Sequence, residues 1–312
     1  DRDEMADMQQ LLERLIQKVK APLMIDSTDP AVIEKALEYC QGKSIINSIN
    51  LEDGEERFQK VVPLAHRFGA AFVVGCIDDD PDQGMAITVE RKVEVARKSF
   101  DLLTGKYGVP PQDIIFDALV FPCATGDANY TGSAAATIEG VAAIKKEFPQ
   151  CKTILGVSNV SFGLPAAGRE VLNSVFLYHC TRAGLDLAIV NTEKLQRYPT
   201  IAEEERQLAE NILFNRGEDP IAAFAEFYKE KKPVDNRPPR HERPLEERLS
   251  SAIVEAIREN LTEDIDEALQ SMKPLEIING PLMNGMDEVG RLFGNNELIV
   301  ADQLLHTVKP FD

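Results

Sequence analysis

The chain has 312 residues, a length that fits one large domain or a large domain and a small one. Apolar residues make up 44% of it, which is enough for a sizeable core and excludes a disordered composition. Its net charge of -18 is unsuited to nucleic acid and to anionic membranes, so neither is expected as a partner.

From the start to about residue 230, short runs rich in β-branched residues alternate with amphipathic segments. Continuous apolar runs are typical of strands buried on both faces, and their alternation with helices predicts parallel βαβ units. The predicted strands are residues 23–27, 44–50, 72–78, 114–121, 153–162 and 185–191. The predicted helices include residues 8–19, 31–40, 55–68, 89–107, 132–148 and 168–183.

A polar residue stands at or near the C-terminal end of every predicted strand. These residues are Asp26, Asn47, Asp78, Asp117, Asn159 and Asn191. In a (β/α)8 barrel such ends converge on one mouth, whereas in the competing architecture, a doubly wound sheet, they spread along an edge. We therefore predict an α/β fold with a TIM-type (β/α)8 barrel. Because six strands are visible and the chain opens on a helix, the barrel is expected to lack its first two strands.

The composition changes after Tyr228. Residues 229–243 are charged and carry three prolines, which is typical of a linker. Beyond them, amphipathic patterns predict helices at residues 244–260, 264–272, 274–293 and 298–308. A segment this short cannot form a large core, so a small all-α bundle that docks on another part is expected. The predicted domains are a barrel over 1–230, a linker over 231–243 and a helical domain over 244–312.

Disulfide bonds, metal binding and membrane insertion are not expected. The five cysteines are far apart and form no C-x-x-C pair, which favours reduced thiols. No histidine stands at the strand ends, and no apolar run reaches the roughly 20 residues of a membrane span. The first residues do not resemble a signal peptide, so a cytoplasmic location is expected.

Asp26, Asn47, Asp117 and Asn159 form the strongest candidate site. A carboxylate in an apolar strand is unfavourable unless it is paired. Each residue has an alternative role as a helix cap, but four unrelated caps need not share one end of a barrel. Carboxylates and amides in fixed positions suit a flat heterocycle with alternating N–H and C=O groups, such as a pterin. The positions hold no His, Cys or Lys, so no protein nucleophile is expected.

Several segments resemble the pterin-binding barrel of cobalamin-dependent methionine synthases. They are MIDST, NSIN, IIFDALVFPCATG, GVSNVSFGLPAAGREVLNSVFL and LDLAIVN. A second block, PLEIINGPLMNGMDEVGRLFG at residues 274–294, resembles the helical cap that precedes the cobalamin domain in that family. Dihydropteroate synthases share the barrel but lack this cap.

The resemblance implies a function. Members of the family transfer the methyl group of 5-methyltetrahydrofolate to cob(I)alamin and on to homocysteine in methionine biosynthesis. It implies that Asn159 hydrogen-bonds N5 of the folate and stabilises its protonated form as the methyl group leaves. The expected pterin contacts are Asp26, Asn47, Asp117, Ser158 and Asn191.

The chain also departs from the family. It contains no zinc- and homocysteine-binding module and no D-x-H-x-x-G motif, so cobalamin is expected to be bound by a partner domain absent from this chain. The segment after residue 297 fits the family cap poorly. We expect the folate-binding part of a methyltransferase that is incomplete on its own. A non-catalytic folate-binding or scaffold module is the alternative, followed by a dihydropteroate-synthase-like enzyme, which the absence of a basic residue in 153–162 disfavours.

Overall fold

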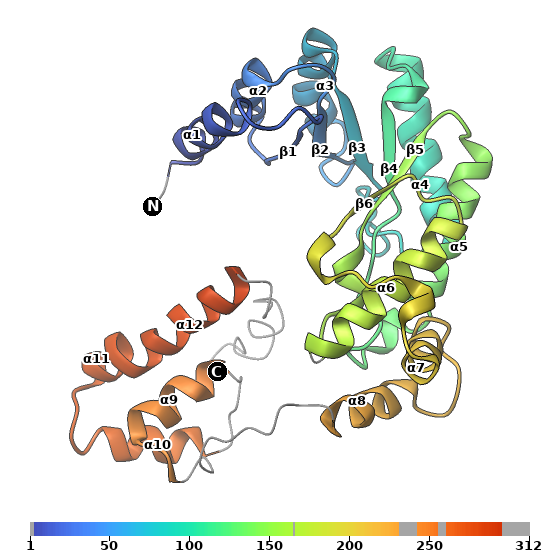
Figure 1. The fold of residues 1–312 in the computed structure, drawn as a ribbon. Coiled ribbons are helices and arrows are strands. Elements are labelled where there is room, and N and C mark those ends of the chain that lie inside the picture. Colours follow the sequence, from blue (N-terminus) through green and yellow to red (C-terminus); the bar gives the residue numbers. More distant parts are fainter. Residues whose placement is uncertain (1–2, 165, 231–241, 255–259, 295–312) are drawn as a thin grey trace. The chain divides into compact units, whose positions relative to one another are not determined.

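The computed structural model describes residues 3–164, 166–230, 242–254 and 260–294. The chain divides into two compact units, with the boundary between Glu226 and Phe227 (Figure 1). Most of the predicted linker and the predicted last helix at 298–308 lie outside the described residues.

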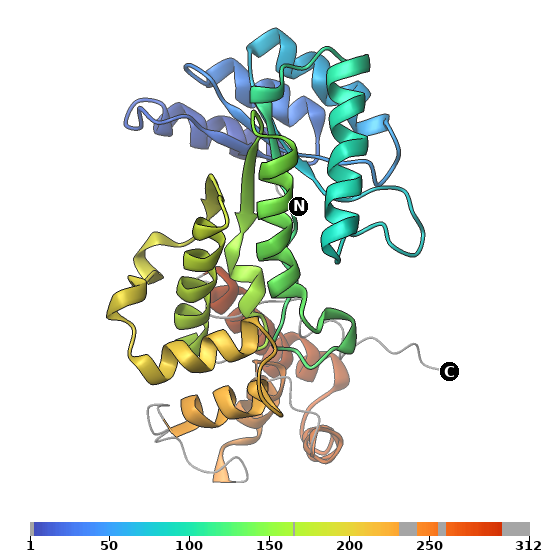
Figure 2. The ribbon, with the colours of Figure 1, turned by 90° about the vertical axis from the view of Figure 1, so that its right-hand side faces the viewer.

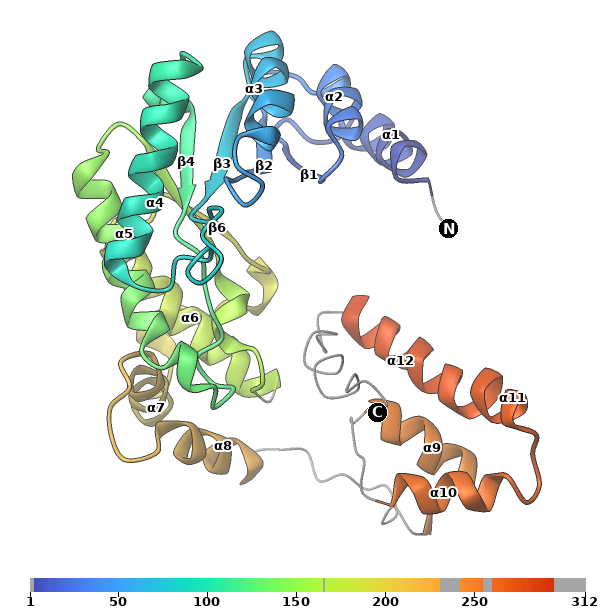
Figure 3. The ribbon, with the colours of Figure 1, turned by 180° about the vertical axis from the view of Figure 1, so that it is seen from behind.

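The first unit is built on a parallel sheet whose six strands are adjacent in chain order. A doubly wound sheet would instead place its first strand inside the order. The sheet curls, as Figures 1 and 3 show, so the barrel prediction is confirmed and the doubly wound alternative is excluded. The strands are β1 (Met24–Asp26), β2 (Ile45–Ile49), β3 (Ala71–Gly75), β4 (Ile114–Asp117), β5 (Lys152–Gly156) and β6 (Leu187–Ile189).

Helices connect the strands and lie on the outer side of the curled sheet (Figures 1 and 3). Neighbours along the chain pack together, and α4 and α5 run side by side in Figure 2. A π-helical turn, Leu102–Lys106, continues α4. The helices up to β6 are α1 (Glu4–Leu15), α2 (Pro30–Tyr39), α3 (Glu56–Phe68), α4 (Val89–Asp101), α5 (Ser133–Glu147) and α6 (Ala166–Arg182).

Two helices after β6, α7 (Glu203–Leu213) and α8 (Pro220–Glu230), were not among the predicted elements. Three glutamates fill the first turn of α7, where the helix dipole favours negative charge. Its apolar face is short, with Ala209, Ile212 and Leu213 buried. The charge pattern was therefore a better signal for α7 than its hydrophobic periodicity.

Local chemistry explains where α2 begins. The Asp29 side chain accepts a hydrogen bond from the Ala31 N–H at 2.8 Å, and Pro30 occupies the first helical position. Asp29 is therefore the cap of α2, and Asp26 does not have the capping role that its neighbourhood allowed.

All six strands are shorter than the sequence predicts, and two of them end well before the predicted residue. β4 ends at Asp117 rather than at residue 121, and β5 ends at Gly156 rather than at residue 162. The 3-10 helix Val157–Ser161 follows β5 directly, with its apolar side chains buried. A short apolar run does not by itself distinguish a strand from a buried helical turn, which explains the difference.

The second unit is all helical over its described residues, as predicted. Its elements are α9 (Leu245–Val254), α10 (Leu261–Ala268), α11 (Pro274–Ile277), the π-helical turn Ile278–Leu282 and α12 (Met283–Gly294). Leu249, Ala268 and Ile277 form its small core. The single helix predicted over 274–293 is broken at Gly280, whose backbone is not helical, next to Pro281. None of the described helices has the length and apolarity needed to cross a membrane.

Replacing Gly285 by alanine should destabilise this unit by about 1–3 kcal/mol. A Cβ at Gly285 would lie 2.6 Å from the Ser250 carbonyl oxygen and 2.8 Å from the Ile253 Cβ, both on α9. Gly290 on the same helix is the matched control, because a Cβ there meets nothing within 4 Å. Gly290→Ala should stabilise α12 by about 0.5–1 kcal/mol. Urea unfolding of both variants measures the difference, and equal effects would contradict close packing of α9 on α12.

Candidate functional site

The C-terminal ends of the strands carry a layer of polar and small residues on the inner face of the sheet. Below it, Ala71, Val73, Ile115 and Ile154 form a buried apolar cluster, against which Met24, Ile45 and Leu187 pack. Side chains alternate between faces along a strand, so residues two positions further on share that face. These next positions hold Asp26, Asn47, Gly75, Asp117, Gly156 and Ile189. Three predicted polar residues therefore share one layer above an apolar floor, and two glycines leave space around Asp117.

Asp26 and Asn47 are register partners on neighbouring strands. Asp26 is exposed and Asn47 is half-buried. Within the described part of the chain, neither side chain has a hydrogen bond or an ion pair. Their polar atoms are therefore available to a ligand at the mouth of the barrel.

Asp117 ends β4 and is the register partner of Gly75. One carboxylate oxygen, Oδ1, accepts a hydrogen bond from the Leu119 N–H at 2.8 Å. Burial raises the pKa of Asp117 to about 6, although the Leu119 N–H and the Lys92 ammonium group counteract the rise. At neutral pH the carboxylate is mostly ionised in a poorly solvated place. Hydrogen-bond donors from a ligand would stabilise this state.

Asn159 lies beyond β5, on the 3-10 helix, and is half-buried. Its Nδ2 atom lies 3.5 Å from the place that a Cβ on Gly156 would occupy. The amide therefore folds back over Gly156 and reaches the level of the polar layer. Ser158, which precedes it, is exposed.

The remaining two strand-end residues have structural partners. The Oδ1 atom of Asn191 accepts a hydrogen bond from the Glu193 N–H at 3.1 Å and caps the short 3-10 helix Thr192–Lys194. Asp78 is buried and forms ion pairs with Arg91 at 2.5 Å and Lys98 at 3.3 Å. Asp78 is thus part of the loop's own structure, and Asn191 has a cap role besides its predicted pterin contact.

Two cations that sequence reasoning missed hold the backbone at or just beyond the C-terminal ends of the strands. Arg57 of α3 donates to the carbonyl oxygens of Ser27 at 2.9 Å and Ser48 at 3.3 Å, just beyond Asp26 and Asn47. Lys92 of α4 does the same for the loops after β3 and β4. Lys92 occupies a buried position of α4, where a lysine is rarely found, so hydrophobic patterning of the sequence does not identify it.

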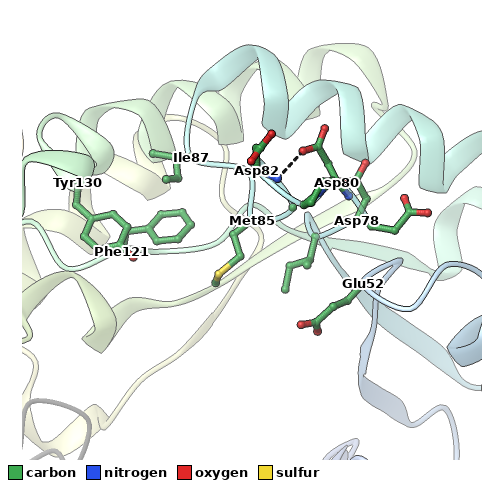
Figure 4. Close-up of a pocket in the computed structure, with 12 residues that line it drawn as sticks. Glu52, Asp78, Asp80, Asp82, Met85, Ile87, Phe121 and Tyr130 are labelled. Atoms are coloured by element: carbon green, nitrogen blue, oxygen red, sulfur yellow. Dashed lines mark hydrogen bonds between the residues drawn. The ribbon is translucent and has the colours of Figure 1, made fainter. Parts of the chain in front are cut away.

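A hollow of roughly 450 Å³ lies beside the polar layer, between the loops that follow β2, β3 and β4. Phe121 and Tyr130 stack on one side of it, with ring centroids 5.2 Å apart, and carboxylates such as Asp80 line another side (Figure 4). Asp80 already accepts the backbone N–H groups of Asp82 and Gln83. Over the described residues, no group of three His, Cys, Asp or Glu is placed to hold a metal ion. None of the predicted pterin contacts lines this hollow.

Comparisons with known proteins match two families to separate parts of the chain. A family described as pterin binding enzyme matches residues 1–191, and one described as B12 binding domain matches residues 245–307. The chain is 40% identical over 307 residues to the methionine synthases of Mycobacterium tuberculosis (strain ATCC 25618 / H37Rv) and Mycobacterium leprae (strain TN). These matches cover 95% of this chain but 26% and 25% of the relatives, so the chain spans about a quarter of their length.

Proposed function

Because the chain belongs to the pterin binding enzyme family, we propose that its barrel binds 5-methyltetrahydrofolate as part of a methyltransferase of the methionine synthase type. The observation that carries this proposal is the polar layer of Asp26, Asn47 and Asp117 on an apolar floor, beside two glycines. A pterin ring fits such a space, because its donors meet carboxylates and its faces meet apolar side chains. The alternative of a dihydropteroate-synthase-like enzyme has less support. Lys152 begins β5, at the end away from this layer, and pairs with Asp186.

We assign separate roles to the polar residues. Asp117 accepts the 2-amino and N3–H groups of the pterin, while Asp26 and Asn47 fix the ring from the neighbouring strands, with further contacts from Ser158 and Asn191. Asn159 hydrogen-bonds N5. A methyl group on a neutral amine is a poor electrophile, so transfer requires a protonated N5. The amide oxygen of Asn159 can stabilise this form, whereas the proton comes from solvent because an amide does not supply one.

The helical unit is proposed to lie against cobalamin, which when bound supplies the nucleophile that accepts the methyl group. Its exposed apolar side chains, Leu275, Ile278, Met283 and Met286, suit the face of a large macrocycle. Its described residues include no His or Cys that could ligate cobalt, so we assign to them the role of covering the cofactor. The corresponding domains are the barrel over 1–230, a linker over 231–243 and the helical domain over 244–312. The proposed setting is one-carbon metabolism and methionine biosynthesis in the cytoplasm.

Calorimetric titration of the full chain with 5-methyltetrahydrofolate tests the proposal, and saturable binding is expected. Asn159→Ala should retain binding within several-fold, because the pterin ring keeps its other contacts. Methyl transfer to added cob(I)alamin, followed by absorbance, should fall about 100-fold or more, because charge at N5 develops as the methyl group leaves. A chain that is folded by circular dichroism and binds no methyltetrahydrofolate would overturn the proposal.

A further inference from the structure

Lys92 is a fully buried cation next to the candidate site. Its ammonium group donates to the carbonyl oxygens of Ala86 at 2.9 Å, Ala118 at 2.5 Å and Leu119 at 3.3 Å. It also lies 5.1 Å from the ring centroid of Phe121. Burying a charge is unfavourable unless its donors are satisfied, and here three acceptors match the three N–H bonds of the ammonium group.

The neighbouring helix is shaped to admit this lysine. A Cβ on Gly140 of α5 would lie only 2.6 Å from the Lys92 Cδ. Glycine within a helix is less favourable than alanine. At this position it provides the space through which the aliphatic part of Lys92 passes. The contact therefore joins two helices and the loops of two strands.

Two of the three acceptors belong to the turn that follows Asp117. Leu119 has a φ of 62°, in the left-handed region that is unfavourable for leucine, and its N–H donates to the Asp117 Oδ1. The Leu119 carbonyl oxygen accepts hydrogen bonds from both Lys92 and the Thr137 hydroxyl group, the latter at 3.0 Å. An anchored Leu119 fixes the direction of the N–H that holds the carboxylate.

We propose that Lys92 is a positioning residue for folate binding, because its ammonium group fixes the 117–119 turn and thereby aims the Asp117 carboxylate at the pterin. The inference rests on the proposed function of Asp117. It assigns to Lys92 no contact with the substrate.

The charges around Lys92 predict how folate binding depends on pH. The titratable groups that face it are Asp117 and Cys76. Burial lowers the pKa of Lys92 to about 8 and raises that of Cys76 to about 12, so at pH 7 the lysine is charged and the thiol is neutral. The Lys92 charge lowers the pKa of Asp117. Folate binding should therefore rise as pH passes about 6 and decline as pH passes about 8.

The test compares Lys92→Met, which keeps the aliphatic stem and removes the charge, with the unaltered chain. The dissociation constant of 5-methyltetrahydrofolate at pH 7 should increase about 10- to 100-fold in the variant. The rise in binding near pH 6 (the acidic limb of the pH profile) should move to higher pH in the variant. The decline near pH 8 (the alkaline limb) should disappear. Thr137→Val is the matched control, because it removes a neutral donor to Leu119. It should weaken binding less and leave both limbs in place.

The possible outcomes distinguish a failure of this inference from a failure of the proposed function. Binding by Lys92→Met with an unshifted pH profile, whether weakened or not, would show a merely structural role and overturn the inference. If circular dichroism shows that Lys92→Met does not fold, the pH profile of the unaltered chain is the test instead. A profile without a decline in folate binding near pH 8 would then overturn the inference. Failure of the unaltered chain to bind would instead overturn the proposed function.

Discussion

Replacing Asp117 by asparagine is expected to weaken 5-methyltetrahydrofolate binding by about 100-fold or more, which corresponds to ~3 kcal/mol. A carboxylate accepts two donors of a pterin side by side, whereas an asparagine amide accepts one and presents its own NH2 group to the other. Hydrogen bonds to a charged group contribute about 1.5–3 kcal/mol each. The amide oxygen can still accept the Leu119 N–H, so the turn after β4 should persist.

The matched control is Asp113→Asn, which removes a carboxylate just before the opposite end of the same strand. Asp113 forms an ion pair with Lys43 at 2.5 Å, away from the polar layer. Its replacement should change the dissociation constant less than threefold, since an ion pair with an exposed lysine contributes little. Equal binding by Asp117→Asn and the unaltered chain at neutral pH, measured by calorimetry, would remove Asp117 from the site.

The positions that sequence reasoning predicted best are those that follow from strand alternation. Asp26, Asn47 and Asp117 each end an apolar strand, and a period of two places them on the inner face with the apolar cluster below. The sequential strand order also follows from regular βα alternation, because short connections keep neighbours adjacent. For these residues, the alternation along the strand and the arrangement of the sheet predict the same position.

The less predictable residues depend on contacts between distant segments. Asn159 reaches the polar layer only because β5 ends early and a 3-10 helix turns the chain back over Gly156. Lys92 and Gly140 are 48 positions apart, and the space beside Gly140 is what admits the aliphatic part of Lys92. Hydrophobic patterning treats a lysine as exposed, so a buried one that binds three carbonyl groups appears only when the loops are placed in space.

The same Asp117→Asn change is expected to stabilise the chain against unfolding at neutral pH. Burial raises the pKa of Asp117 from 3.8 to about 6 in the folded chain. A carboxyl group with a raised pKa favours folding when protonated, and this contribution is lost as pH rises through about 6. At about 1.4 kcal/mol per pKa unit, the full loss is roughly 3 kcal/mol. Because the side chain is only half-buried, a gain of about 1–3 kcal/mol in the variant is expected.

The pH dependence distinguishes this mechanism from a general packing effect. The difference in unfolding free energy between Asp117→Asn and the unaltered chain should be near zero at pH 4, increase between pH 4 and pH 6, and level off by pH 7, where Lys92 is still charged. Urea unfolding at these values measures it, and titrating groups that do not interact with Asp117 cancel in the difference. A variant that is less stable at pH 7, or equally more stable at every pH, would contradict the unfavourable burial of this carboxylate. If stability rises while binding is lost, the carboxylate persists at the end of β4 because the ligand requires it, since the fold is more stable without it.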